Sequence, residues 1–245
     1  MQTIDLKRLN ISPESRVLDL GCGRGRHAHA VAYHHRARVW AMDLDFDSAR
    51  QSQQGFELIE PEKADRTQTW LLLNGDCLAL PFSNQAFDIV ICSEVLEHLP
   101  DYHSALLEMR RVLTADGILA LSVPRYWPER VCWALSTEYR HDPGGHLRIF
   151  KTTPLVLEIK RLGFLRLSRH HAHALHSPYW WLKCFNWARK DSWGPIRLYH
   201  RFLVWEMTTS PRLFEFFEKF LPPLLGNSAV LYFQKKRSLC KVHIF

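Results

Sequence analysis

The sequence contains no run of about 18 apolar residues, and this absence argues against a membrane-spanning helix. Its beginning, MQTIDLKRLNISPESRV, lacks the apolar core of a signal peptide. The six cysteines are scattered and include no CxxC pair. Together these absences lead us to expect a reduced, cytoplasmic protein.

The positive charge of the chain is unevenly distributed. Its 245 residues carry a formal net charge of +7. Between Arg166 and Arg201 there are seven Lys or Arg residues, one Asp and five His residues. Such local basicity suits nucleic acid, an anionic membrane or an acidic substrate. A solvated basic surface is the alternative interpretation.

Strand-like and helix-like segments alternate over the first 125 residues. Residues 101–117 form an amphipathic pattern that predicts a helix, with Asp101 as its N-cap and Gly117 at the turn after it. Uninterrupted apolar runs favour strands that are buried on both faces, as in a parallel sheet. The alternation therefore predicts an α/β fold with a doubly wound sheet. The predicted strands are 16–20, 37–45, 69–76, 87–93 and 118–124.

A turn rich in glycine joins the first predicted strand to a helix. Residues 16–27 read RVLDLGCGRGRH, with glycines at 21, 23 and 25. Glycines let the backbone approach a ligand, and the helix directs its N-terminal amides at that ligand. A dinucleotide-binding turn has the pattern G-x-G-x-x-G/A, so the third glycine here comes one residue early. Asp19, just before the turn, would repel a pyrophosphate and attract an ammonium group.

Two further acids end predicted strands, Asp43 the second and Asp76 the third. Ligands of open α/β sheets lie at the carboxyl ends of the strands, where Asp43 could accept both hydroxyls of a ribose. Asp76 could accept an exocyclic amine of an adenine. Each acid alone could instead cap a loop or a helix, but three together beside a glycine turn favour a ligand site. An ammonium, a ribose and an adenine without phosphates describe S-adenosylmethionine, which is the expected cofactor.

Four separated segments resemble the class I S-adenosylmethionine-dependent methyltransferases of the small-molecule type. They read VLDLGCGRGRH, VWAMDLD, NGDCLALPFSNQAFDIVICSEVLEHLPD and MRRVLTADGILALSVP, over about residues 15–125. The resemblance implies a Rossmann-like methyltransferase fold, with a seven-stranded, mostly parallel sheet and an antiparallel last strand. The cofactor-binding residues that it implies are Asp19, Gly21, Cys22, Gly23, Gly25, Asp43, Leu44, Asp76, Cys77, Ser93 and Glu94.

Methyl transfer from a sulfonium mainly requires the protein to align the acceptor and exclude water. A base helps when the acceptor is a hydroxyl, a phenol or a carbon acid. The candidate catalytic residues are His98 and His146, although His98 could instead support the loop after the fourth strand. The candidate contacts to the acceptor molecule are His141, Arg148, Tyr179 and Trp180. Arg148 could equally pair with a surface carboxylate.

We expect no metal ion. Histidines stand at 170, 171, 173 and 176, but on a strand only His171 and His173 share a face. Two imidazoles are too few for a closed zinc site, and no carboxylate or cysteine is placed to complete one.

The segment before the last predicted strand is unusually long. About fifty residues separate the strand predicted at 164–175 from that at 229–236, whereas the resembled family usually has a near hairpin there. The segment contains SPYWWLKCFNWARKDSW and a predicted amphipathic helix that begins at Ser210 and Pro211. We predict an aromatic-rich helical cap over the site; a helical buttress on the sheet edge and a docking element for an anionic membrane are the alternatives. Residues 125–150 are expected to be irregular.

The predicted organisation is an α/β cofactor-binding core over 1–175, the helical insertion over 176–228, and the last strand with a C-terminal tail over 229–245. The favoured function is an S-adenosylmethionine-dependent methyltransferase acting on a small, largely apolar acceptor such as a lipid, a quinone or a natural product. The rivals are a nucleic-acid methyltransferase that uses the basic, aromatic C-terminal third, and a non-catalytic protein that binds the cofactor. Residues 93–96 read Ser-Glu-Val-Leu and not Asn-Pro-Pro-Tyr, which disfavours nucleic acid. The sequence leaves the acceptor atom and the oligomeric state open, and peripheral membrane contact is compatible with the cytoplasmic location.

Overall fold

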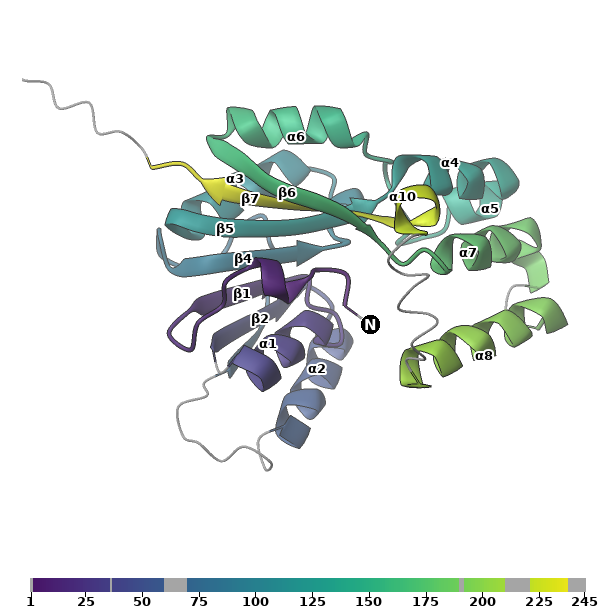
Figure 1. Ribbon diagram of the computed structural model, residues 1–245, viewed down its shortest axis with the longest axis horizontal. Helices are drawn as coiled ribbons and strands as arrows, with labels where there is room; N and C mark the ends of the chain where they lie inside the picture. Colours follow the sequence, from purple (N-terminus) through teal and green to yellow (C-terminus); the bar gives the residue numbers. More distant parts are fainter. Residues whose placement is uncertain (1, 36, 60–69, 190–191, 210–220, 238–245) are drawn as a thin grey trace, which may run out of the picture.

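The computed structural model describes residues 2–35, 37–59, 70–189, 192–209 and 221–237. One seven-stranded sheet organises them, with the strand order β3-β2-β1-β4-β5-β7-β6 (Figure 1). Neighbouring strands are parallel except for β7, which runs antiparallel to both β5 and β6. The strands are β1 (Arg16–Leu20), β2 (Arg38–Asp43), β3 (Trp70–Asn74), β4 (Phe87–Ser93), β5 (Leu113–Pro124), β6 (Phe164–Ala172) and β7 (Ser228–Lys235).

The strand order reverses between β1 and β4, which makes the sheet doubly wound. The predicted fold, including the antiparallel last strand, is confirmed. Ligands of such sheets bind at the point of reversal, at the carboxyl ends of the strands. The glycine turn after β1 and residues 94–98 after β4 lie at this point.

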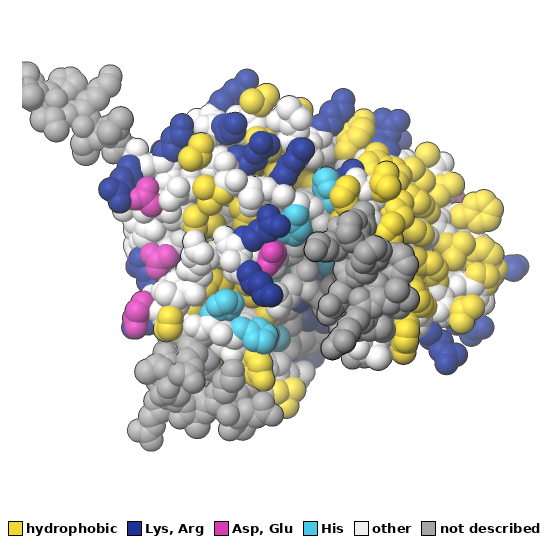
Figure 2. All heavy atoms as spheres, in the orientation of Figure 1, with side chains coloured by type: hydrophobic (Ala, Val, Ile, Leu, Met, Phe, Trp, Pro, Cys, Tyr) yellow, Lys and Arg dark blue, Asp and Glu magenta, His cyan; other side chains and the backbone are white. Residues whose placement is uncertain are grey.

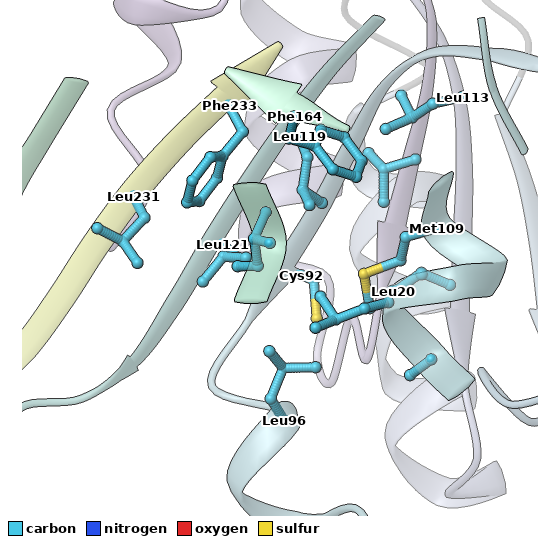
Figure 3. Close-up of a cluster of buried hydrophobic side chains, with 14 of the residues drawn as sticks. Leu20, Cys92, Leu96, Met109, Leu113, Leu119, Leu121, Phe164, Leu231 and Phe233 are labelled. Carbon is cyan, nitrogen blue, oxygen red and sulfur yellow. The ribbon is translucent and has the colours of Figure 1, made fainter. Parts of the chain in front are cut away.

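Helices cover both faces of the sheet (Figure 1). On one face, α1 (Arg26–His35) and α2 (Phe46–Ile59) bury Val31 and Phe56. On the other, α3 (Tyr102–Val112) and α6 (Thr152–Arg161) bury Met109 and Ile159. Figure 3 shows Met109 beside Leu20 and Cys92 in this second core. Burial of each such side chain stabilises the fold by about 1.5–3 kcal/mol. This packing holds in place the strand ends that carry the site.

The helix predicted over 101–117 is correct at its start and wrong at its end. The Asp101 side chain accepts a hydrogen bond from the Ser104 amide at 3.0 Å, as an N-cap does. The helix ends at Val112, and β5 begins at Leu113, which pairs with Phe87 of β4. Gly117 therefore lies within the span of β5, at the irregularity between the paired residues Leu113 and Ile118.

Several short helices gather at the carboxyl ends of the parallel strands (Figure 1). Two of them, α4 (Tyr126–Leu135) and α5 (Thr137–Arg140), lie within 125–150, so the expectation of an irregular segment there is wrong. Between β6 and β7 the chain forms α7 (His176–Phe185), the 3-10 turn η4 (Trp187–Arg189), α8 (Gly194–Thr209) and α10 (Pro222–Leu225), which is the predicted helical insertion. The helix predicted from Ser210 and Pro211 lies outside the described residues. Within the described ranges, no helix combines the length and the apolar character needed to cross a membrane.

Candidate functional site

A cavity of about 590 Å³ opens at the carboxyl ends of β1, β2 and β4. We call it the first cavity. It has the size of a small-molecule site and a mainly apolar lining with a few acids. Its lining residues are Gly21, Gly23, Met42, Asp43, Leu44, Gly75, Asp76, Cys77, Leu78, Glu94, Val95, His98, Leu99 and Pro100.

The glycine turn serves both the cavity and the packing of the chain. All three glycines have positive φ, between 53° and 83°. A Cβ on Gly21 would lie 2.3 Å from Val95 Cγ2, and one on Gly25 would lie 2.3 Å from Ser52 Oγ. A Cβ on Gly23 would meet no atom within 4 Å, and Gly23 lines the cavity. Gly23 thus gives a ligand access to the backbone, while Gly25 lets α1 approach α2.

Asp43 holds the turn in place from the end of β2. Its Oδ2 accepts a hydrogen bond from the Gly23 amide at 2.7 Å, and its Oδ1 accepts one from the Asp45 amide at 2.9 Å. Across the cavity, Asp76 Oδ1 accepts from the Leu78 amide at 2.9 Å. Both carboxylates line the cavity, and each has further lone pairs for hydroxyl or amine donors.

Asp19 lies beneath the turn and is 1 % exposed. Its Oδ2 accepts from the Ala28 amide at 3.0 Å, and its Oδ1 has no hydrogen-bond partner among the described residues. Burial raises the pKa of this carboxyl to about 7, although the Ala28 amide opposes the shift. A buried carboxylate oxygen without a donor is costly, and a cationic ligand group would supply the missing donor.

A second cavity of about 300 Å³ adjoins the first. Aromatic rings form part of its wall: Tyr139 lies 5.1 Å from Trp187 and 5.9 Å from Trp180 between ring centroids. Glu94 and His98 line both cavities, so the two spaces meet at these side chains. The remaining lining residues are Pro124, Glu129, Asp142, Pro143, Gly144, Gly145, His146 and Asn227.

Two histidines face the junction in a defined tautomer. His146 Nδ1 lies 2.7 Å from Glu129 Oε1, and His98 Nδ1 lies 3.2 Å from the Gly145 carbonyl oxygen. A carbonyl and an ionised carboxylate only accept, so each ring donates through Nδ1–H, and in the neutral ring Nε2 carries the lone pair. Burial and the neighbouring His146 lower the pKa of His98, which favours that neutral form.

Three glutamates surround these histidines. Glu94 accepts from Ser122 Oγ at 2.7 Å, and burial raises its pKa against that hydrogen bond. Burial also raises the pKa of Glu97, with repulsion from Glu94 and Glu129 adding to the shift. Tyr139 donates to Glu129 at 3.0 Å, and burial with that neighbouring charge raises the pKa of the phenol. The junction is therefore rich in groups that hold or exchange protons.

Seven of the predicted cofactor residues line the first cavity: Gly21, Gly23, Asp43, Leu44, Asp76, Cys77 and Glu94. Four do not line it: Asp19, Cys22, Gly25 and Ser93. Cys22 is buried with its amide donating to the Met42 carbonyl at 3.1 Å, and Ser93 Oγ lies 3.0 Å from Ser122 Oγ. All four are buried, so they shape the turn and the end of β4 from beneath the cavity.

Of the residues predicted to act in catalysis or to contact the acceptor, some line the second cavity and the others do not. His98, His146 and Trp180 line the second cavity. His141 is exposed and bonds the Thr137 carbonyl at 2.8 Å, and Tyr179 packs beside Tyr199, so neither lines it. Arg148 lies outside both cavities and donates to carbonyl oxygens of the loop between β4 and α3, at 2.9 Å for Pro100. The guanidinium therefore braces the loop, and neither a substrate anion nor a surface carboxylate is needed to explain it.

Several residues that line the second cavity were not predicted from the sequence, notably Glu129, Tyr139 and Trp187. Glu129 and Tyr139 lie on α4 and α5, in the stretch expected to be irregular. A helical pattern in residues 126–135, WPERVCWAL preceded by Tyr126, is the signal that could have located Glu129.

One group of side chains could hold a metal ion among the residues that the structure describes. Glu97, His98 and His146 each offer one ligand atom, and these atoms lie within 4.8 Å of one another. Because 48 to 49 residues separate His146 from the other two, no local sequence pattern predicts this group. The histidine cluster at 170–176 serves packing instead, since His170 stacks on Tyr232 and His173 Nε2 lies 2.9 Å from Thr3 Oγ1.

Comparison with known proteins identifies the kind of domain. Residues 18–121 match the family described as "Methyltransferase domain". A sterol 24-C-methyltransferase of Gibberella zeae is 30 % identical over 189 residues, covering 71 % of this chain and 46 % of that protein. A demethylmenaquinone methyltransferase of Staphylococcus epidermidis is 31 % identical over 114 residues, covering 46 % and 45 %. The chain thus spans about half the length of these relatives.

The fold is also found in solved structures. The crystal structure of a Bacillus halodurans protein assigned as a methyltransferase superposes with a TM-score of 0.61 at 21 % identity, over 95 % of this chain and 97 % of that one. At this identity the likeness concerns the fold. It extends past the matched domain to include the helices and strands that follow β5.

Proposed function

The chain belongs to the class I S-adenosylmethionine-dependent methyltransferase superfamily, and on that premise we propose that it methylates a small, largely apolar acceptor held in the second cavity. The observation that carries the proposal is that two adjoining cavities share Glu94 and His98. A methyl donor in one cavity and an acceptor in the other would meet at these residues. Aligning the methyl donor with the acceptor is the main contribution of a protein to a displacement reaction.

The first cavity fits the cofactor of the superfamily. On the cavity lining, Asp43 suits the ribose hydroxyls and Asp76 suits the adenine amine. Asp19 lies beneath the glycine turn, where its unpaired Oδ1 adds negative potential that favours an ammonium group. Gly23 leaves space beside the backbone. When bound, S-adenosylmethionine supplies a methyl group on a sulfonium, and the electron pair of the carbon–sulfur bond leaves with the sulfur as the acceptor atom takes the carbon.

The second cavity supports an acceptor with a planar apolar body and a proton-bearing reactive end. The rings of Tyr139, Trp180 and Trp187 offer flat apolar walls, whereas Glu94 and the two histidines form a polar end at the junction. A hydroxyl, a phenol or a carbon acid loses a proton when it is methylated, and these groups can accept it. A quinol-like acceptor combines both features, which is consistent with the demethylmenaquinone named for one relative; the sterol named for the other shares the apolar body.

A membrane would supply such an acceptor, and the exposed surface supports peripheral contact with one. Figure 2 shows hydrophobic side chains gathered at the right of the view, over the region of α4, α5 and α7. Phe185 on α7 and Leu198 on α8 are each 70 % exposed. The cationic side chains of Lys183 and Arg197 lie on the same helices. Apolar and basic side chains together favour an anionic bilayer surface.

The test of the proposal has two stages. Calorimetry should show binding of S-adenosylmethionine and of its demethylated product, and no binding of NAD. Incubation with cofactor carrying a labelled methyl group, together with lipid extracts and a panel of quinols and phenols, should then yield a labelled small molecule that mass spectrometry identifies. Binding of NAD in place of the sulfonium cofactor would refute the cofactor assignment. Binding without label transfer to any of these acceptors would count against the acceptor class.

A further inference from the structure

Glu97 carries a fully buried carboxylate for which the described residues provide no hydrogen-bond donor. It lies in the 3-10 turn η3 (Leu96–His98) and is 0 % exposed. Neither of its carboxylate oxygens has a hydrogen-bond partner among the described residues. An ionised carboxylate in such a place costs several kcal/mol unless a cation or a donor compensates it. The neighbouring Glu94 and Glu129 add negative charge and do not supply that compensation.

The two histidines beside Glu97 are arranged as metal ligands usually are. Metal-binding histidines almost always donate the second ring nitrogen to a carboxylate or a backbone carbonyl. His146 donates Nδ1–H to Glu129, and His98 donates Nδ1–H to the Gly145 carbonyl. The ring centroids of His98 and His146 are 5.1 Å apart. With Nδ1 held in these bonds, Nε2 is the nitrogen that each ring can offer to a metal ion.

We propose that Glu97, His98 and His146 bind a divalent transition-metal ion at the junction of the two cavities. Their ligand atoms lie within 4.8 Å of one another. Ligands bound at about 2.1 Å around one ion lie roughly 3.0–3.4 Å apart, so the three side chains need to close by no more than about 2 Å. Since His98 is exposed and His146 half-buried, small tilts of the two imidazoles about their Nδ1 hydrogen bonds would supply this closure.

The donor set indicates the class of ion. Two imidazoles and one carboxylate suit Zn²⁺, Mn²⁺, Fe²⁺, Co²⁺ or Ni²⁺, whereas an all-oxygen set would suit Ca²⁺. Three protein ligands leave coordination positions open, as in metal sites that act on a substrate. Because His98 lines both cavities, an open position would face the space where acceptor and methyl donor meet.

The ion would give the proposed methyl transfer a defined acceptor chemistry, and this step rests on the proposed function. An acceptor hydroxyl oxygen bound to the ion loses its proton more readily, as metal-bound water does. With both histidines bound to the ion, Glu94 at the junction is the group left to take that proton. The oxygen then forms its bond to the methyl carbon as the carbon–sulfur bond breaks. The site thus favours acceptors that carry a hydroxyl or an enol, and it disfavours simple alkenes.

The experiment is a titration of the untagged, chelator-treated full chain with Co²⁺, followed by visible absorption, and with Mn²⁺, followed by electron paramagnetic resonance. The wild-type protein should bind one equivalent more tightly than any other. Glu97→Gln and His146→Ala should weaken that equivalent at least tenfold while keeping a wild-type melting curve. The matched control is Glu158→Gln, since Glu158 lies 2.9 Å from His103 Nδ1 on the α3–α6 surface, outside both cavities. The control should bind as the wild type does.

Equal binding by wild type and Glu97→Gln, or no binding by the wild type, would overturn the metal site. If a variant unfolds, Mn²⁺ resonance on wild type with and without S-adenosylhomocysteine decides instead: an ion at the junction changes its spectrum when the first cavity fills, and an ion elsewhere does not. Calorimetry with S-adenosylmethionine on the same samples separates the two proposals. Cofactor binding without metal binding refutes the metal site alone, whereas metal binding without cofactor binding refutes the proposed function and leaves the site standing.

Discussion

Nδ1 of His146 lies 2.7 Å from a carboxylate oxygen of Glu129, which belongs to α4 and is almost wholly buried. The two residues are 17 positions apart, and the pair lies on the second cavity. The hydrogen bond restrains the orientation of the imidazole and leaves Nε2 as the nitrogen that can take part in chemistry. Glu129 is therefore a positioning residue, which acts on the chemistry through His146.

Replacing Glu129 with Gln should lower turnover about tenfold or more, because the amide cannot hold His146 in the same charge environment. The affinity for S-adenosylmethionine should stay within about twofold, since Glu129 does not line the first cavity. Steady-state kinetics over a range of pH, together with calorimetry, provides the measurement. A kcat that is unchanged, with a shifted cofactor Kd, would show that Glu129 serves the fold near the first cavity instead.

Asp43→Ala should weaken cofactor binding by about 1–3 kcal/mol, because the ribose donors lose a charged acceptor. The same change removes the hydrogen bond to the Gly23 amide, so the melting temperature should also fall. Calorimetry and thermal unfolding measure the two effects. Asp45→Ala serves as the control, because its side chain bonds the Ser48 amide at the start of α2 and does not line the cavity. Equal cofactor affinity of Asp43→Ala and wild type would contradict the assignment of the ribose carboxylate.

Asp19 should make cofactor binding depend on pH. Its pKa is raised to about 7 by burial, and an ammonium ligand needs the ionised form. Affinity for S-adenosylmethionine should therefore increase roughly tenfold as the pH rises from 5.5 to 7, and Asp19→Asn should lose this dependence. Isothermal titrations at several pH values test it. A flat profile for the wild type would place the ammonium elsewhere.

The raised pKa of Asp19 should also make the stability of the cofactor-free protein depend on pH. Between the unfolded pKa, near 4, and the folded pKa, near 7, the folded state holds more protons at Asp19 than the unfolded state does. The contribution of Asp19 to the free energy of unfolding therefore falls as the pH rises through this window. Denaturant unfolding at pH 4.5 and pH 7.5 should show the wild type losing stability relative to Asp19→Asn. The opposite trend would mean that the folded-state pKa is not raised.

The sequence predicts the cofactor side of the site well because that chemistry is local. Asp43 and Asp76 each follow a short apolar run, and the glycine turn is contiguous, so strand ends and motif spacing locate them. The acceptor side depends on tertiary contacts that no local pattern records. Glu129, Tyr139 and His146 come together only because α4 and α5 fold over the ends of β4 and β5. The end of α3 shows the same limit within the core, because Leu113 pairs with Phe87 of β4 where the helical pattern would continue.

Binding to anionic vesicles should depend on the exposed apolar side chains of the helical insertion. Phe185→Ser combined with Leu198→Ser should reduce co-sedimentation with vesicles of anionic phospholipid several-fold, since both side chains are 70 % exposed and would enter the interface. Leu58→Ser is the control: this leucine on α2 is 78 % exposed, and the variant should sediment as wild type does. No sedimentation of the wild type in low salt would remove the membrane as the source of the acceptor.

Trp187 and Trp180 should determine the affinity for the acceptor, because both line the second cavity beside Tyr139. Replacing Trp187 with Ala removes an aromatic wall, and the lost contact should raise KM for the acceptor about tenfold, which corresponds to about 1.4 kcal/mol. The cofactor Kd should not change, since neither tryptophan lines the first cavity. The matched control is Trp193→Ala, in the same segment but outside the second cavity, where its ring lies 6.5 Å from Phe185. If Trp193→Ala raises KM as much as Trp187→Ala does, the segment acts as a buttress whose general packing matters. If only the cavity tryptophans raise it, the helices after β6 form a cap over the acceptor.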